Sequence, residues 1–541
     1  MVKNINRQAA GHIVFYALFG LISTILMGYY LSNTVIHFTT PQQFPINSFQ
    51  RFPLSFLIFP AEVFSFLFTL YFIYNMINGN IKSKTPNPFP NKKETSVAVL
   101  IPVYNEPKEI VANTLSACRK LRWEGGTKIY LLDDSTKEKD MQNMNFLSKK
   151  FGCSLVRRKD RIGYKAGNIN NALREKIQEE FFVILDSDQA PEPEFLEETM
   201  DFFTDSNVAF VQTPQHFVNT GTPLERASKL GTSIFYYSQC VSKAKDGALP
   251  FCGTNAVMRT SAFKKVSGFS YYTATEDIEL GLRLNEAGFY GAYVPKILVH
   301  GYAPVDFLAY ASQQYRWANG NLAILRESWL KILFGKFSLR HQIHTFFTLG
   351  WWVIGITTLV YIIVPILSLF LGGTHHTWLP TLLLELLFLN VLMGIMTIFA
   401  SLHQRIDGEK IKFSDAFLQY SLITNSMFIF SKAFFAAMFK NYAGFVRTSK
   451  IKSNLSIWQL KWNLLLCAIC FGFSIFALYK GSIASDVQQV RTYFPTSVWL
   501  LFYSIVLGSS VIFIDNRPSQ FAVDADYHDA DSVPNLKGAL A

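Results

Sequence analysis

The sequence is poor in charged residues and in cysteine for its length. Asp, Glu, Lys and Arg make up 16% of the 541 residues, against roughly 25% in ordinary soluble domains. The six cysteines show neither paired C-x-x-C spacing nor a Cys/His metal spacing, which argues against a disulfide scaffold and a zinc site. Phe is far commoner than Tyr or Trp, at 50 against 24 and 9, which favours lipid-facing surface over nucleic-acid binding. These shortages argue against a wholly soluble protein, and we expect no nucleic-acid partner.

Long apolar runs lie towards both ends of the chain. Half of the residues are hydrophobic and the mean hydropathy is +0.19. A helix needs about 20 apolar residues to cross the hydrocarbon core of a bilayer. No small-residue cleavage site follows the first run, so that run predicts a membrane anchor rather than a signal peptide. The predicted spans cover residues 12–31, 53–76, 344–371, 378–402, 461–479 and 497–514.

Basic residues orient these spans. Lys3 and Arg7 precede the first run, and a basic cluster that includes Lys82 and Lys92 follows the second. Because basic flanks favour the cytosolic side, the segment after the second span is predicted to be cytosolic. Residues 417–439 are also apolar, but a crossing there would place a basic loop outside, so we predict a helix that lies flat at the cytosolic interface. The sequence thus predicts a multi-pass protein of the cell membrane (inner or plasma membrane), with six crossings plus interface helices.

The middle of the chain has the pattern of an α/β domain. Between residues 95 and 330 no apolar run is long enough to span, and short apolar strands alternate with amphipathic stretches. That alternation is typical of a largely parallel sheet. Strands are predicted at residues 97–102, 129–132, 181–185 and 208–212. The predicted organisation is an N-terminal transmembrane pair with a linker (1–94), a cytosolic catalytic domain (95–330), interface helices with C-terminal spans (331–515) and a short cytosolic tail (516–541).

Acidic residues follow two of the predicted strands. Asp133 and Asp134 end the second strand, and Asp186 and Asp188 follow the third. Open α/β sheets bind ligands at the carboxyl ends of their strands. Side chains at i and i+2 of an extended segment project to the same side, so Asp186 and Asp188 are candidates to hold Mg²⁺ or Mn²⁺ against a diphosphate. The alternative is that they cap the helix predicted at residues 193–203.

Two other segments have both a ligand-binding and a purely structural interpretation. After the first strand, Tyr104 and Glu106 suit a base and a ribose, although a proline-flanked turn is often only a turn. Lys165 stands before a small turn that enters a helix. That is a fair arrangement for binding phosphate, or an ordinary glycine turn with a solvated lysine.

A third segment begins a helix with two acids. Thr275 is predicted as the N-cap, and Glu276 and Asp277 fall in the first turn of a helix that ends before Gly288. Acids at this position stabilise a helix by themselves, but a carboxylate facing a sugar hydroxyl would also be a positioned general base. Upstream, the apolar-to-glycine turn at residues 251–255 can approach a ligand closely.

A fourth segment combines an amide, a guanidinium and an indole. Gln313, Arg316 and Trp317 lie within about a turn of helix. Arginine binds a diphosphate bidentately, and tryptophan offers a flat apolar face to a sugar ring. The alternative is an interfacial Trp–Arg pair just before a membrane span, where both residue types are common.

The order and intervals of these motifs resemble the signature of processive, membrane-embedded family 2 glycosyltransferases, a group that includes cellulose, curdlan, chitin and hyaluronan synthases. The stretches at residues 165–168, 251–254 and 445–450 look most like the cellulose-synthase-like branch, and the last is similar to its gating loop. The likeness covers roughly residues 95–515. The motifs concerned are Asp133-Asp134, Asp186-x-Asp188, Thr275-Glu276-Asp277 and Gln313-x-x-Arg316-Trp317.

The resemblance implies a cytosolic GT-A-like α/β domain inserted in an α-helical transmembrane domain. It also implies a processive, inverting transfer from a UDP-sugar, most simply UDP-glucose, to a growing β-1,4- or β-1,3-glucan that is exported through a channel, with Mg²⁺ or Mn²⁺ as cofactor. The implied partners are the donor, the polysaccharide acceptor, the lipid bilayer and an accessory export subunit. The resemblance implies catalysis by Asp277 with Glu276, cation binding by Asp186 and Asp188, and gating by Phe445, Thr448 and Lys450. The residues implied to bind the acceptor are Trp317, Cys252, Gly253 and Thr254. Those implied to bind the nucleotide-sugar are Tyr104, Glu106, Asp133, Asp134, Lys165, Asp186, Gln313 and Arg316.

Some features depart from the family pattern and leave alternatives. Arg447 stands where cellulose synthases usually have valine, and residues 516–541 are too short for a cyclic-di-GMP-binding domain, so control of that kind would need a partner. A chitin- or mannan-type synthase remains an alternative, as does a nonprocessive transferase acting on a lipid phosphate, which usually lacks the Gln-x-x-Arg-Trp motif. A transporter or channel would explain the spans but not the acids at successive strand ends.

Overall fold

The structure is a computed structural model of the chain. It describes residues 52–79, 86–370, 405–406, 409–441, 455–485 and 487–515, with scattered positions in 17–29 and 391–398. The chain forms two compact units: the first takes in residues 1–81, 351–434 and 454–516, and the second takes in residues 82–350, 435–453 and 517–541. The spans predicted at 12–31 and 378–402 lie largely outside the described residues, and the gating-like stretch at 445–450 lies wholly outside them.

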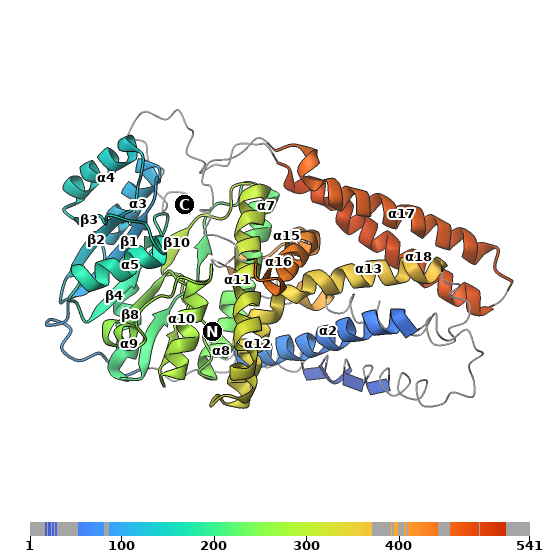
Figure 1. The fold of residues 1–541 in the computed structure, drawn as a ribbon, viewed down its shortest axis with the longest axis horizontal. Helices are drawn as coiled ribbons and strands as arrows, with labels where there is room; N and C mark the ends of the chain where they lie inside the picture. The colour runs from blue at the N-terminus through green and yellow to red at the C-terminus, as the bar shows by residue number, and fades with distance from the viewer. Residues whose placement is uncertain are drawn as a thin grey trace. The chain divides into compact units, whose positions relative to one another are not determined.

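The second unit is built on a seven-stranded sheet (Figure 1). The strand order is β3-β2-β1-β4-β8-β6-β9, and only β8 runs antiparallel to its neighbours. The predicted, largely parallel sheet is therefore confirmed, with one reversed strand that its short, turn-flanked sequence did not reveal. The strands are β1 (Val97–Val103), β2 (Thr127–Asp133), β3 (Ser154–Val156), β4 (Phe181–Ile184), β6 (Val208–Gln212), β8 (Ala256–Arg259) and β9 (Tyr290–Tyr293).

Helices cover both faces of this sheet. Alternate residues of β1 point to opposite faces, so Val97 and Val99 pack with one helical layer while Ala98 and Leu100 pack with the other. All four are fully buried, which is why the strand reads as one continuous apolar run. The first layer consists of α3 (Lys108–Cys118), α4 (Glu138–Phe151) and α6 (Phe195–Thr199), which a 3₁₀ turn (Met200–Thr204) extends, and the second of α5 (Tyr164–Glu175), α9 (Thr260–Lys265) and α10 (Glu276–Glu286).

A smaller sheet and a set of longer helices complete the second unit. The small sheet has the order β5 (Ala190–Pro191), β10 (Val299–Gly301) and β7 (His216–Phe217). A continuous helical stretch runs through α7 (Pro223–Ile234), a π-helical segment (Phe235–Cys240) and α8 (Val241–Lys245). It is followed, after the main sheet closes, by α11 (Phe307–Phe334) and α12 (Leu339–Gly350). The Asp306 side chain caps α11 by accepting the backbone N–H of Ala309 at 2.8 Å.

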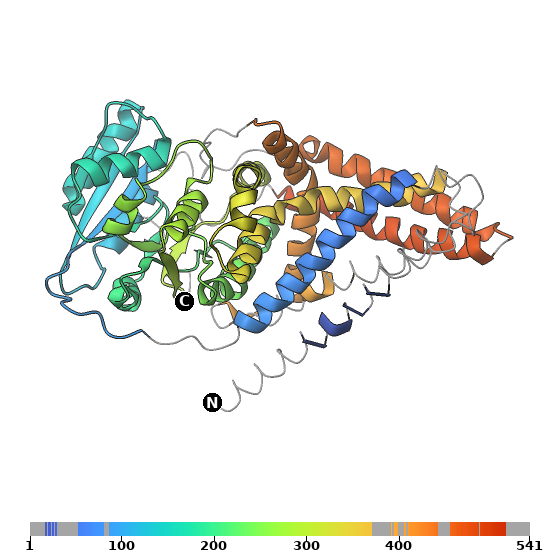
Figure 2. The same cartoon turned by 60° about the horizontal axis from the view of Figure 1, so that its bottom comes forward.

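The first unit is helical. Its described elements are α2 (Phe52–Gly79), α13 (Ile354–Phe370), α15 (Phe413–Asn425), α17 (Lys461–Ser482), α18 (Val487–Gly508), part of α16 (Met427–Met438) and a short hairpin of β11 (Arg405–Ile406) and β12 (Glu409–Lys410). In both views α17 and α18 run side by side (Figures 1 and 2). Buried polar groups also link the helices, since Tyr361 Oη donates to Ala61 O at 3.1 Å and Trp499 Nε1 donates to Tyr361 O at 2.8 Å.

Five stretches of the described residues are long and apolar enough to cross a membrane, namely 57–79, 339–370, 413–438, 457–482 and 493–513. Four of them coincide with predicted spans, although the one expected at 344–371 already begins at residue 339. The stretch 413–438 also qualifies by length and composition, and its helix is interrupted at Ser426, between α15 and α16. Its flat placement at the interface stays a prediction.

Candidate functional site

One cavity of about 200 Å³ in the second unit gathers most of the predicted site residues. It lies at the carboxyl ends of β1 and β4, as expected for an open α/β sheet, and is closed by residues of α5, α10 and α11. Of the predicted site residues, Asp133 and Thr254 do not line it. Those that do are Tyr104, Glu106, Asp134, Lys165, Asp186, Asp188, Cys252, Gly253, Glu276, Asp277, Gln313, Arg316 and Trp317. The gating-like residues Phe445, Thr448 and Lys450 lie outside the described residues.

An ion pair lines the cavity. Lys165 Nζ donates to Asp186 Oδ1 at 2.6 Å and to Gly253 O at 3.0 Å. Burial works to lower the pKa of Lys165, but the carboxylate of Asp186 outweighs it, so the pKa of this lysine is raised. Thr254 fixes the backbone next to the pair, because its buried Oγ1 accepts the backbone N–H of Asp186 at 2.9 Å. Lys165 is therefore a fixed positive charge rather than a solvated side chain.

The two acids after β4 face the cavity and do not cap a helix. Helix α6 has Glu194 at its N-cap position, with no side-chain cap hydrogen bond, so the capping alternative is wrong for Asp186 and Asp188. Their carboxylate oxygens are donors that Mg²⁺ and Mn²⁺ accept. Among the described residues no group of three or more His, Cys, Asp and Glu side chains is placed to hold a metal. The donor set thus fits a cation that takes part of its ligands from a bound substrate, as Mg²⁺ commonly does.

Glu276 and Asp277 open α10 against the glycine turn. The backbone N–H of Ile278 donates to Asp277 Oδ1 at 2.8 Å, and a Cβ at Gly253, whose φ is +76°, would lie 2.6 Å from Asp277 Oδ2. Burial raises the pKa of Asp277 against the opposing effect of Lys165 and Arg316. Burial and the charge of Asp277 raise the pKa of Glu276. The pair therefore holds protons at higher pH than ordinary carboxylates do.

Thr275 is the N-cap residue of α10, as predicted, although its side chain makes no cap hydrogen bond. Instead it packs on α11, where a Cβ at Gly320 would lie 2.5 Å from Thr275 Oγ1. This close approach fixes the start of α10 against the helix that carries Arg316 and Trp317, which lie on one face of α11 with Gln313.

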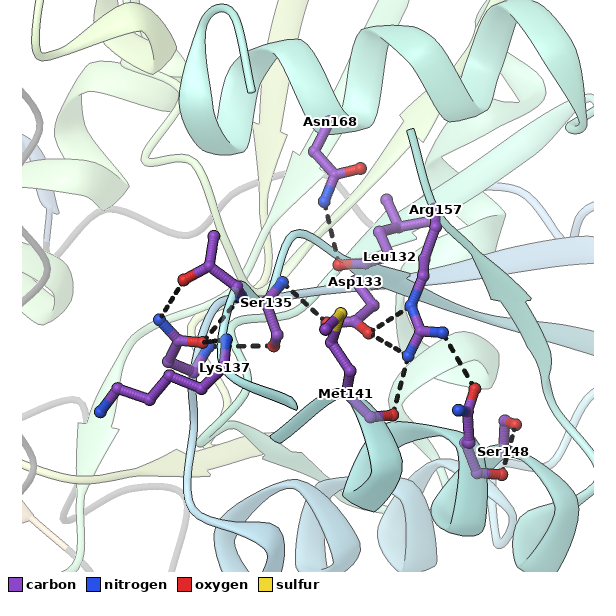
Figure 3. A network of polar contacts seen from close by, with 11 residues as sticks. Leu132, Asp133, Ser135, Lys137, Met141, Ser148, Arg157 and Asn168 are labelled. Atoms are coloured by element: carbon purple, nitrogen blue, oxygen red, sulfur yellow. Dashed lines mark hydrogen bonds and ion pairs between the residues drawn. The ribbon is translucent and has the colours of Figure 1, made fainter. Parts of the chain in front are cut away.

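The acids after β2 are held in ion pairs. Figure 3 shows Asp133 facing Arg157, whose Nε and Nη2 lie 2.8 and 2.7 Å from Asp133 Oδ2. Asp134 is held in the same way by Arg158, with Nε and Nη2 at 2.9 and 2.6 Å. The parallel register pairs Leu132 with Val156, so the two acids at the end of β2 stand opposite the two arginines that follow β3. Only Asp134 also lines the cavity.

Arg158 positions a loop that sequence reasoning missed. It donates to Ile162 O and Tyr164 O, both at 2.7 Å, and a Cβ at Gly167 would clash with this loop. The loop presents Arg161, whose guanidinium carbon lies 3.5 Å from the ring centre of Tyr104. The sequence contained a signal for this loop: the arginine pair 157–158 follows β3, and the aspartate pair 133–134 stands at the end of the preceding strand, β2.

Comparisons with known proteins point in one direction. Residues 181–400 match a family model described as Glycosyl transferase family group 2. The chain is 28% identical over 330 residues to the cellulose synthase catalytic subunit [UDP-forming] of Xanthomonas axonopodis, covering 59% of this chain and 43% of that protein. It is 33% identical over 279 residues to a probable glucomannan 4-beta-mannosyltransferase of rice, covering 47% and 48%. The chain thus spans less than half the length of these curated relatives.

Among solved structures, a mannosyltransferase from Pyrobaculum calidifontis, in complex with GDP-Man and Mn²⁺, matches with a TM-score of 0.47 at 15% identity, covering 72% of this chain and 98% of that one.

The hydroxyl beneath the ion pair gives a direct test of the site. Thr254→Val keeps the shape of the side chain but leaves the buried N–H of Asp186 without an acceptor, which costs about 1–3 kcal/mol. We expect binding of UDP in the presence of Mn²⁺, measured by isothermal titration calorimetry, to weaken about tenfold or more.

The matched control is Thr213→Val, which removes another buried hydroxyl, bonded to Asn255 O at 3.0 Å. An equal loss in both variants would mean that Thr254 acts through general stability and not through Asp186.

Proposed function

The chain is related to the family 2 glycosyltransferases, among them cellulose synthases and glucomannan mannosyltransferases, and on that premise we propose that it polymerises a β-glucan from UDP-glucose by processive, inverting transfer and exports the product across the membrane. The observation that carries the proposal is the single cavity in which Lys165–Asp186, Glu276–Asp277 and Arg316–Trp317 meet. Its GT-A-like domain would work on the cytosolic side, where the UDP-sugar is available.

The donor end of the cavity suits a nucleoside diphosphate. Lys165 and Arg316 are cations that would neutralise the charge that builds on the leaving UDP. Tyr104 would take the base and Glu106 the ribose, with Asp134 holding the loop beside them. Asp186 and Asp188 would hold Mg²⁺ or Mn²⁺, and a cation bound there supplies electrostatic stabilisation to the departing diphosphate.

Asp277 is the proposed general base. A base must reach the proton that it abstracts and be ionised when it does so. Asp277 lines the cavity and is fixed by the N–H of Ile278 and by the turn at Gly253. It would take the proton from the acceptor hydroxyl as that oxygen attacks the anomeric carbon from the face opposite UDP. Direct displacement of this kind inverts the configuration from α to β without a covalent enzyme intermediate.

The acceptor end is proposed to be Trp317 with the turn at Cys252 and Gly253. The indole, half-buried and facing the cavity, would stack on the terminal sugar ring. The helices of the first unit that are long and apolar enough to span a bilayer support export of the polymer. An aromatic stacking surface suits processive synthesis, since it binds a sugar ring by its face and releases it without breaking a specific set of hydrogen bonds.

A mannan-type synthase is the second candidate function. The 33% identity to the rice glucomannan mannosyltransferase favours it specifically. The two functions are separated by incubating purified membranes with radiolabelled UDP-glucose or GDP-mannose and Mg²⁺ or Mn²⁺, then digesting the polymer with linkage-specific glycanases. Incorporation from UDP-glucose into a glucanase-sensitive product supports the first proposal, and incorporation from GDP-mannose alone would replace it by the second.

Removing the base should stop synthesis without emptying the donor site. In Asp277→Asn the amide has no basic oxygen for the acceptor proton, so we expect sugar incorporation to fall by at least about 10³-fold, within the range for losing general base catalysis. Affinity for UDP, measured by calorimetry, should stay within about threefold of wild type. Polymer made at the wild-type rate by this variant would exclude Asp277 as the base.

The pH dependence should report the coupling of the two acids. Asp277 must be deprotonated to act, and its raised pKa means that activity falls as the pH drops through a value above the ordinary aspartate range. The charged groups around it are Glu276, Lys165 and Arg316. The charge of Asp277 helps raise the pKa of Glu276 to about 7, so Glu276 still holds its proton when Asp277 loses its own, and Glu276→Gln should leave the acid limb of the rate profile in place. Arg316→Gln removes a positive charge that lowers the pKa of Asp277, so it should move the acid limb to higher pH.

The control for this shift is Glu286→Gln, which neutralises an exposed acid at the far end of the same helix and should leave the limb in place. An acid limb that does not move in Arg316→Gln would show that Asp277 does not set the pH dependence.

Chain length should depend on Trp317. Trp317→Ala removes the stacking surface, so products sized by gel chromatography should become shorter while hydrolysis of UDP-glucose persists. Trp329→Ala, in the same helix but 47% exposed and outside the cavity lining, is the matched control. Products of unchanged length from Trp317→Ala would contradict the acceptor role.

A further inference from the structure

Gln189 is a buried side chain that the mechanism above does not use. It follows Asp188 directly, lines the same cavity and is 4% exposed. Its Oε1 is buried and has no hydrogen-bond partner among the residues that the structure describes. Because buried polar atoms in folded proteins are nearly always paired, an orphaned amide oxygen at the wall of a cavity calls for an explanation.

The backbone brings Gln189 next to the two acids. The N–H of Gln189 donates to Asp186 O at 3.0 Å, which closes a turn whose first and last residues are Asp186 and Gln189. The ends of such a turn lie within about 7 Å of one another. The turn therefore brings the backbone of Gln189 close to that of Asp186, and Asp186, Asp188 and Gln189 all line the same cavity.

The small sheet holds the Gln189 side chain in place. Ala190 of β5 pairs with His300 of β10 in antiparallel register, which sets Gln189 opposite Gly301. A Cβ at Gly301 would overlap both amide heteroatoms of Gln189, so the missing side chain at residue 301 is what makes room for the amide. The amide of Gln189 is thus packed against the backbone at Gly301.

The acids alone are a weak site for a divalent cation. Asp186 already shares its charge with Lys165 at 2.6 Å, and no third His, Cys, Asp or Glu side chain joins the two acids among the described residues. A neutral amide oxygen is a hard ligand of the kind that Mg²⁺, Mn²⁺ and Ca²⁺ use in proteins.

We propose that Gln189 Oε1 is a further protein ligand of the divalent cation held between Asp186 and Asp188, so that the turn presents an all-oxygen set selective for Mg²⁺ or Mn²⁺ over softer metals. The inference rests on the proposed function, in which that cation binds with the donor diphosphate.

The test measures cation binding rather than activity. The purified full chain, in detergent or nanodiscs, is titrated with Mn²⁺ alone and with Mn²⁺ plus UDP, and free Mn²⁺ is read from its electron paramagnetic resonance signal. Gln189→Leu keeps the bulk and removes the oxygen, so the dissociation constant for Mn²⁺ should rise about tenfold. Gln189→Glu keeps an oxygen and adds a charge, so its affinity should equal or exceed that of wild type.

Gln215→Leu is the matched control, because Gln215 lines the same cavity from the segment before β7, and its Mn²⁺ affinity should equal that of wild type. Unchanged Mn²⁺ affinity in Gln189→Leu would overturn the proposal. Weaker binding of UDP-glucose relative to UDP in that variant, with Mn²⁺ affinity intact, would instead assign the oxygen to a sugar hydroxyl.

The two proposals fail separately. If UDP does not bind to the wild-type chain, the proposed function is wrong, while the titrations with Mn²⁺ alone still decide whether Gln189 is a ligand. If UDP and Mn²⁺ both bind and the leucine variant matches wild type, the transferase proposal stands and only the ligand assignment is lost.

Discussion

The ion pair between Lys165 and Asp186 is the interaction on which the rest of the site depends. It joins the start of α5 to the end of β4, and through Gly253 O it also reaches the turn that packs on Asp277. The pair is partly buried, since the side chains of Lys165 and Asp186 are 19% and 36% exposed. Gly253 O accepts a second hydrogen bond from the lysine, and Thr254 Oγ1 accepts the backbone N–H of Asp186. Three distant segments of sequence are thereby fixed around one volume, which lets a cavity of modest size hold both cationic and acidic groups.

Much of this arrangement could be predicted from the sequence. The short apolar runs gave the central strands, because a strand buried on both faces cannot alternate with polar residues. The acids at residues 186 and 188 and the helix start at residue 276 were expected to carry chemistry, and they line one cavity. Parallel strands place their carboxyl ends together, so the convergence of strand-end residues follows from the topology alone.

What escaped prediction depends on register and on close packing. Asp133 and Asp134 were expected at the nucleotide, and each is held by an arginine that follows the neighbouring strand. That pairing follows only once the register of β2 and β3 is known. The reversal of β8 is set by its neighbours in the sheet. Thr254 bonds the backbone of Asp186 from more than sixty positions away, and Gln189 is covered by a strand more than a hundred positions away. A local sequence pattern contains neither contact.

The contact between Gly320 and Thr275 has a mechanical consequence. Because Gly320 has no side chain, the backbone of α11 packs directly against Thr275, the N-cap residue of α10. Any shift or rotation of α11 therefore also moves Glu276 and Asp277, which follow Thr275 directly. A ligand that displaces Trp317 would thereby also displace Glu276 and Asp277, so the positions of the indole and of the two carboxylates are coupled through one helix.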